Sequence, residues 1–220
     1  MKDKRKTLII SLAGLMAVLL LTVISINRIK SFLYVSTEDA RIDGDLVKIS
    51  PQASGRLADL FIDEGSYVEK NEIVARLEAV NLTGGALELS VVRSPINGII
   101  IKEQGTVGEV VGAGQVLAYV INPDDLYISA NIEENRLKGV SVGQPVDIRL
   151  DMYGGVRFSG TVDSIGDAAN SVFSLLPSSS GSTFTKVVQK VPVRIRVDYG
   201  DYEPVIGTNA KVRIHIRQGR

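Results

Sequence analysis

The sequence predicts a mainly β protein with one transmembrane helix at its N-terminus, followed by two small β domains. Three observations predict this class: an uncharged apolar stretch near the N-terminus, short segments of alternating polarity, and an internal repeat. The 220 residues include no Cys, no Trp and one His, which excludes disulfide frameworks, thiol catalysis and cysteine-ligated zinc sites.

Residues 7–26 form the predicted membrane span. These 20 residues carry no charge, and a helix of that length spans about 30 Å, the thickness of a bilayer core. Four basic residues precede the span and two follow it, so residues 1–6 are predicted to be a cytoplasmic tail. A cleaved signal peptide is the competing interpretation, but Ser25-Ile26-Asn27 is a poor cleavage site. We expect a single-pass protein of the cell (inner) membrane with most of its chain outside the cytoplasm.

Charge is divided unevenly along the chain. Residues 1–30 carry a net charge of +5, whereas the remaining 190 residues carry −5. The basic charge therefore belongs to the membrane anchor, and the exported part is not expected to bind nucleic acid.

An internal repeat appears when the chain is compared with itself at an offset of 43 residues. Identical residues then coincide in four pairs, with further pairs of similar residues between them: Gly55/Gly98, Gly65/Gly108, Val68/Val111 and Ala75/Ala118. Each copy is predicted to form short strands joined by turns, with glycines where the backbone needs positive φ. Two copies together would bury the apolar face that one copy would leave exposed.

The C-terminal part shows the clearest strand patterns. Apolar residues occupy alternate positions in 146–150, 191–197 and 212–216. Each segment is predicted to turn one face to a core and the other to water, which is typical of a barrel or sandwich. His215 lies on the polar face of its segment, where a solvated side chain is favoured over a metal ligand.

The repeated pattern resembles the half-motif of biotinyl and lipoyl domains, in which two halves form a flattened β-barrel. A true carrier presents a lysine at the hairpin between the halves. Asn81 stands at that position here, and residues 71–101 contain no Lys. The resemblance therefore implies a structural barrel with no attached cofactor.

The chain as a whole resembles the HlyD-type membrane fusion proteins, which are periplasmic adaptors, and within them the EmrA-like branch. The resemblance covers about residues 35 to 217 and rests on five segments: Thr37–Asp45, Ser50–Leu57, Val140–Val146, Asn170–Pro177 and Lys186–Ile195. Its most specific part is the block that runs from Phe173 to Ile195. It implies a lipoyl-like domain over 47–122, with a short connection at 78–93, and an EmrA-like β-barrel over 123–220 with a loop at 170–186. Residues 27–46 would provide a linker and a strand of that barrel.

One departure from this family stands out. EmrA-type adaptors insert a long α-helical coiled-coil hairpin between the two lipoyl halves, whereas only the 16 residues 78–93 join them here. These are too few for two long antiparallel helices. A natural short adaptor and an engineered deletion both fit this sequence, and docking to an outer-membrane channel is doubtful in either case.

Residues Phe173, Leu175, Leu176 and Pro177 are the candidate contact with a transporter or a hydrophobic substrate. They precede a Ser- and Gly-rich stretch, and two interpretations remain open: an apolar lip that contacts a partner, or a loop that packs back onto the barrel.

The resemblance implies an adaptor subunit of a multidrug efflux or secretion system, which has no catalytic, metal or cofactor site. Its partner would be a major-facilitator drug:proton antiporter of the EmrB type, and the adaptor would form a homo-oligomer. The alternative function is a membrane-anchored scaffold for envelope or cell-wall assembly. The sequence contains neither a phosphate-binding GxxxxGK[ST] loop nor a G-x-S-x-G elbow.

Overall fold

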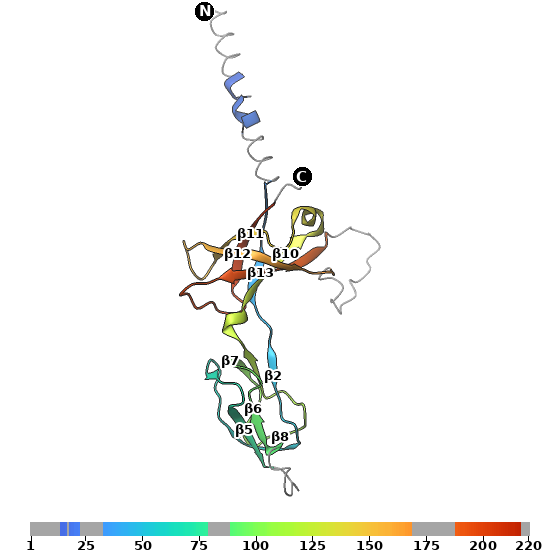
Figure 1. Ribbon diagram of the computed structural model, residues 1–220, viewed down its shortest axis with the longest axis vertical. Helices are drawn as coiled ribbons and strands as arrows, with labels where there is room; N and C mark the ends of the chain where they lie inside the picture. The colour runs from blue at the N-terminus through green and yellow to red at the C-terminus, as the bar shows by residue number, and fades with distance from the viewer. Residues whose placement is uncertain (1–13, 17, 23–32, 79–88, 169–187, 217–220) are drawn as a thin grey trace, which may run out of the picture. The chain divides into compact units, whose positions relative to one another are not determined.

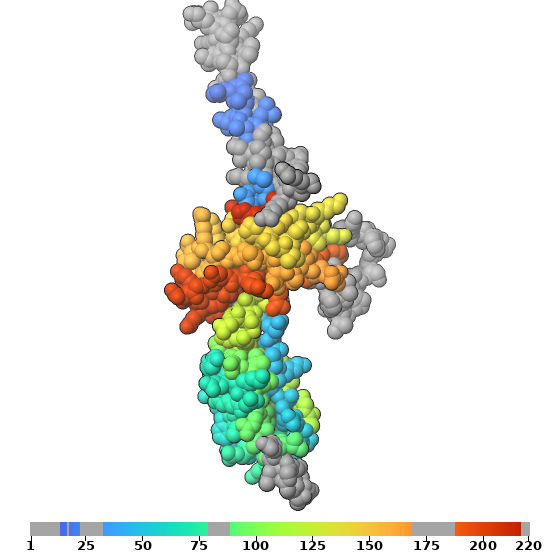
Figure 2. Space-filling view, viewed as in Figure 1, coloured from blue at the N-terminus to red at the C-terminus, as the bar shows by residue number. Residues whose placement is uncertain are grey.

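The computed structural model describes residues 14–16, 18–22, 33–78, 89–168 and 188–216. The chain divides into two compact units, one formed by residues 1–42 with 128–220 and the other by residues 43–127. Both units are built from β strands (Figure 1), which confirms the predicted mainly β class. Figure 2 shows the second unit mainly in teal and green.

Helical structure near the N-terminus is described for residues 14–16 and 18–22. The predicted span of 7–26 thus lies only partly within the described residues. Among these, no helix has both the length and the apolar character that crossing a bilayer requires.

The first unit contains a closed barrel of six strands in the order β1-β10-β13-β12-β11-β14. Its strands are β1 (Tyr34–Asp43), β10 (Tyr127–Glu133), β11 (Pro145–Leu150), β12 (Phe158–Ile165), β13 (Lys190–Asp198) and β14 (Asn209–His215). The three segments with alternating polarity are therefore strands β11, β13 and β14. In β11 the buried residues Val146, Ile148 and Leu150 alternate with exposed neighbours, because successive side chains of a strand point to opposite faces.

A bulge in β1 directs two neighbouring carboxylates to different strands. The register of β1 against β14 shifts between Thr37 and Ala40, so Glu38 and Asp39 are both exposed. Asp39 accepts a hydrogen bond from Lys190 of β13 at 2.8 Å, whereas Glu38 accepts one from Lys211 of β14 at 3.3 Å. The extra residue of a bulge commonly re-aims a side chain in this way.

The second unit consists of two four-stranded sheets in the orders β2-β9-β7-β4 and β6-β5-β3-β8. Its strands are β2 (Val47–Ile49), β3 (Gly55–Leu60), β4 (Tyr67–Val68), β5 (Ile73–Glu78), β6 (Val91–Arg93), β7 (Gly98–Glu103), β8 (Val110–Val111) and β9 (Ala118–Ile121). Strands of both copies of the repeat contribute to both sheets, and they share one buried core.

The two copies of the repeat make matching contacts. The N–H of Gly65 donates to the carbonyl of Ile100 at 2.7 Å, and the N–H of Gly108 donates to the carbonyl of Leu57 at the same distance. Both glycines have positive φ, +87° and +92°, as the sequence predicted. Each copy therefore closes its turn on a strand of the other copy, so neither would be complete alone.

At Asn71 the two copies of the repeat keep the same backbone conformation although the residue differs. It has φ of +69° and corresponds in the repeat to Gly114, whose φ is +80°. The N–H of Asn71 donates to the carbonyl of Ser94 at 2.8 Å, and that of Gly114 donates to the carbonyl of Pro51 at 2.9 Å. Asn is among the few non-glycine residues that adopt this conformation readily.

Candidate functional site

The loop predicted over 170–186 begins and ends on a pair of hydrogen-bonded strands. Strands β12 and β13 are antiparallel, with Ile165 opposite Val193, and the N–H of Gly166 donates to the carbonyl of Pro192 at 2.8 Å. A Cβ at position 166 would lie 2.9 Å from Pro192 Cγ, so glycine permits this close approach. The candidate contact residues Phe173, Leu175, Leu176 and Pro177 lie outside the described residues, and so does Asn81.

A polar cluster lies where the chain returns from this loop. The Lys190 Nζ donates to Asp39 Oδ2 at 2.8 Å, and the Asn131 amide donates to Asp39 Oδ1 at 3.0 Å. These hydrogen bonds lower the pKa of Asp39 below its ordinary value of 3.8, and the one from Lys190 contributes more than the one from Asn131. The hydrogen bond with Asp39 raises the pKa of Lys190 in turn. The cluster joins the start of β13 to β1 and β10.

This cluster gives a pH dependence that can be measured. Since the pKa of Asp39 is lower in the folded state, its contribution to stability is present above pH 3.8 and is lost as the pH falls through the folded-state pKa. We expect the Asp39→Asn variant to melt at a lower temperature than the unmodified protein at neutral pH, and the difference to shrink in acid. Asp167→Asn, at an exposed position, is the matched control. An Asp39→Asn deficit that persisted unchanged in acid would contradict this assignment.

His215 has a specific partner that the sequence did not reveal. Its Nε2 lies 3.0 Å from Asp147 Oδ2 of β11, and its ring meets the Tyr34 ring edge-on with 4.9 Å between centroids. The expectation of a merely solvated side chain was therefore incomplete. The partner is 68 positions away in sequence and becomes a neighbour only because β14 pairs with both β1 and β11.

These contacts can bind and position, but they do not resemble a reaction centre. In the part of the chain that the structure describes, no three Asp, Glu or His side chains gather as metal ligands would. Ion pairs such as Lys190–Asp39 join exposed groups, 47% exposed on each side. Such exposed pairs each contribute little to stability.

The two copies of the repeat are joined by a short connection. Strand β5 ends at Glu78 and β6 begins at Val91. A pair of antiparallel helices in residues 79–90 could rise only about 9 Å at 1.5 Å per residue. The long helical hairpin of the EmrA-like branch is therefore absent from this chain.

Known domain families match both units. Residues 45–123 match the family described as "RND MFP, barrel-sandwich hybrid domain". Residues 125–215 match the family described as "AAEA-like beta-barrel domain".

Among curated relatives, YhbJ of Bacillus subtilis (strain 168), a proposed efflux system component, is 38% identical over 182 residues. That match covers 82% of this chain and 79% of YhbJ. Multidrug export protein EmrA of Haemophilus influenzae is 35% identical over 140 residues, covering 60% of this chain and 36% of the relative. The chain therefore spans most of YhbJ and about a third of this longer EmrA.

Solved structures share the fold at lower identity. The periplasmic adaptor protein EmrA superposes with a TM-score of 0.56 at 16% identity, covering 84% of this chain and 99% of that one. The membrane fusion protein Spr0693 of Streptococcus pneumoniae R6 gives a TM-score of 0.61 at 14% identity, covering 84% and 100%. The arrangement of a barrel and a repeat-built double sheet thus recurs in proteins described as adaptors and membrane fusion proteins.

Proposed function

The chain belongs to the EmrA-like branch of the membrane fusion protein family, and on that premise we propose that it is the adaptor subunit of a multidrug efflux system. Its transporter would be a major-facilitator drug:proton antiporter of the EmrB type in the same membrane. The observation that carries this proposal is the similarity to YhbJ over 82% of the chain, together with relatives named as multidrug export proteins.

The adaptor would act by positioning, without a chemical step of its own. Residues 7–26 would hold it in the cell membrane with its N-terminus in the cytoplasm, and the antiporter would supply energy from the proton gradient. Domains over 47–122 and 123–220 would stand outside the cytoplasm as a homo-oligomer. The paired ends of β12 and β13 would hold the 170–186 loop, and with it Phe173 and its apolar neighbours, against the transporter or its hydrophobic substrate.

The short connection between the halves limits this role. Residues 79–90 cannot extend to a distant channel, so the proposal includes no docking to an outer-membrane channel. The adaptor would serve the exit side of its own transporter.

Photocrosslinking from position 173 in native membranes tests the proposal. We expect a photoreactive residue there to capture a multi-span transporter, while the same residue at Ser164, an exposed position of β12 before the loop, captures little. Repeated capture of envelope-assembly or cell-wall enzymes would favour the alternative scaffold function and contradict efflux. Capture of only a second copy of the chain would assign the loop to the oligomer contact and would also contradict the proposed transporter contact.

A further inference from the structure

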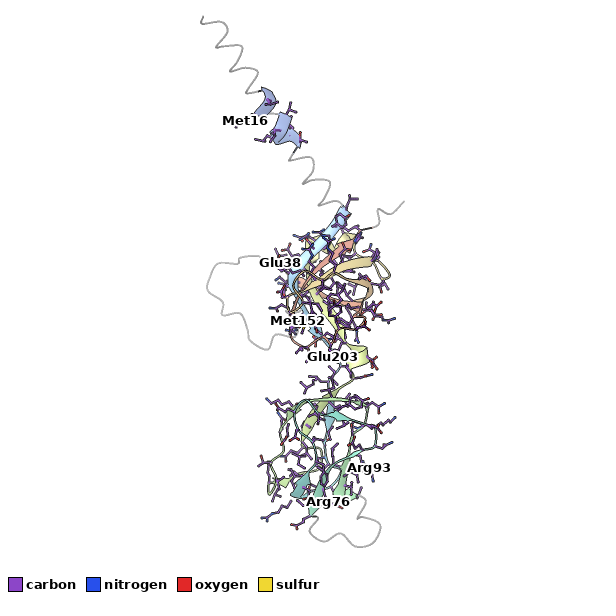
Figure 3. All side chains as sticks on the ribbon, turned by 90° about the vertical axis from the view of Figure 1, so that its left-hand side faces the viewer. Met16, Glu38, Arg76, Arg93, Met152 and Glu203 are labelled. Carbon is purple, nitrogen blue, oxygen red and sulfur yellow. The ribbon has the colours of Figure 1, made fainter. Side chains whose placement is uncertain are left out.

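The outer face of the barrel carries a groove across three neighbouring strands, β1, β14 and β11. Its volume is about 370 Å³. Six charged residues line it: Arg149, Arg157, Lys211, Arg213, Glu38 and Asp147. Glu38 is labelled on the barrel in Figure 3. The groove lined by these residues is called the basic groove.

The register of β11 against β14 places two cations of the groove opposite each other, which is electrostatically unfavourable. Arg149 lies directly opposite Lys211, and Asp147 lies opposite Arg213. Like charges directly opposite each other destabilise a strand pair. The Arg149–Lys211 pairing therefore does not favour the fold by itself.

The two carboxylates of the groove already have partners, one a lysine of the groove and the other a histidine outside its lining. Glu38 lies 3.3 Å from Lys211, and Asp147 lies 3.0 Å from His215. Among the residues that the structure describes, no carboxylate is within 4.0 Å of Arg149, Arg157 or Arg213. Arg213 instead stacks over the Tyr34 ring at 5.6 Å. Three guanidinium groups thus face the groove without a carboxylate partner.

The positive charge of the basic groove contrasts with the negative net charge of the rest of the exported chain. Outside the first 30 residues the chain has a net charge of −5, yet four cations and two carboxylates meet in this groove. A general excess of basic residues therefore does not account for the positive charge of the groove. Such a local concentration of positive charge is expected where a negatively charged ligand binds and neutralises it.

We propose that the basic groove binds the phosphate of an anionic phospholipid headgroup. Guanidinium groups match phosphate oxygens with paired hydrogen bonds, and Arg149 and Arg157 are free to make them. A lipid is favoured over a soluble phosphate because the groove includes the first part of β1, which follows the proposed membrane span closely in sequence. This choice rests on the proposed membrane anchor. Strand β1 begins at Tyr34, and the residues 27–33 between the span and β1 can reach at most about 25 Å.

A cysteine reporter tests the proposal, since the chain contains no native Cys. The full chain is placed in nanodiscs, with an environment-sensitive fluorophore on Ser159→Cys. Ser159 is exposed on β12 opposite Asp147, beside the groove. Ser164→Cys, further along β12, is the reference position. We expect phosphatidylglycerol nanodiscs, but not phosphatidylcholine nanodiscs, to change the signal at position 159.

The Arg149→Gln/Arg157→Gln variant should weaken the apparent affinity for phosphatidylglycerol roughly tenfold or more, since charge-assisted hydrogen bonds are lost. Lys48→Gln/Lys102→Gln removes the same charge from exposed positions of the other unit and should change little. Thermal melting verifies that both variants fold. An equal response of the arginine variant, or no difference between the two lipids, would overturn the proposal. An equal response to inorganic phosphate in phosphatidylcholine nanodiscs would overturn the lipid assignment in favour of a soluble anion.

Discussion

Replacing Gly98 with alanine is expected to destabilise the 43–127 unit strongly. A Cβ at this position would clash with the carbonyl group of Ile121, lying 2.7 Å from its carbon, and would lie 3.0 Å from Val120 Cγ2. Gly98 is on β7, which pairs with β9 on one side and with β4 on the other. Strand β9 is also held by β2, with Val47 opposite Val120, so its backbone cannot move away without breaking a second strand pair.

The expected loss is about 3 kcal/mol or more, the upper range for inserting a methyl group into a packed site. A small domain is stable by only about 5–15 kcal/mol, so this is a large part of the total. The equivalent Gly55 is less constrained, because a Cβ there would lie 2.8 Å from the Glu78 carbonyl oxygen. We therefore expect Gly55→Ala to destabilise the unit less than Gly98→Ala.

Hydrogen exchange followed by mass spectrometry measures this effect in the full chain. Peptides from 43–127 should lose protection in Gly98→Ala, and peptides from the barrel provide an internal reference. Gly112→Ala is the matched control, since a Cβ there meets no atom within 4 Å and its φ is not positive. It should remain within about 0.5 kcal/mol of the unmodified protein. Normal protection in Gly98→Ala would show that β9 can shift, contrary to this account.

The sequence was most informative where the chain repeats itself. Gly65 and Gly108 could be assigned to positive-φ turns because two copies carry glycine at the same place. Asn71 could not, since its repeat partner is Gly114 and a single asparagine does not indicate positive φ. Repetition therefore revealed turns only where both copies kept the residue that the backbone requires.

Surface contacts between distant strands could not be predicted. Alternating polarity indicates which residues of β11 and β14 face outward, but not that Arg149 faces Lys211. That pairing depends on strand order and register, which a single sequence does not specify. The bulge at Glu38 and Asp39 could not be predicted from the sequence either. It pairs these two adjacent carboxylates with Lys211 and Lys190, which are each more than 150 positions away.

The second large expected effect is functional and concerns Phe173. If this residue forms part of an apolar contact with the transporter or its substrate, Phe173→Asp places a charge in that contact, and burying an unpaired carboxylate is costly. We expect the variant to be exported and folded while drug resistance falls to the level of a strain without the adaptor. Ser178→Asp adds the same charge within the neighbouring polar stretch and should retain resistance.

Two measurements on Phe173→Asp separate the open interpretations of the loop. Hydrogen exchange of the barrel strands reports whether the fold survives, and growth in the presence of exported compounds reports transport. Loss of protection in β12 and β13 would mean that Phe173 belongs to the barrel core and would contradict the contact. Retained protection with full resistance would also contradict it, because a charge would then be tolerated where an apolar partner is proposed. Only retained protection with lost resistance fits an apolar lip, because the barrel strands β12 and β13, paired as far as Ile165 and Val193, would then not depend on Phe173.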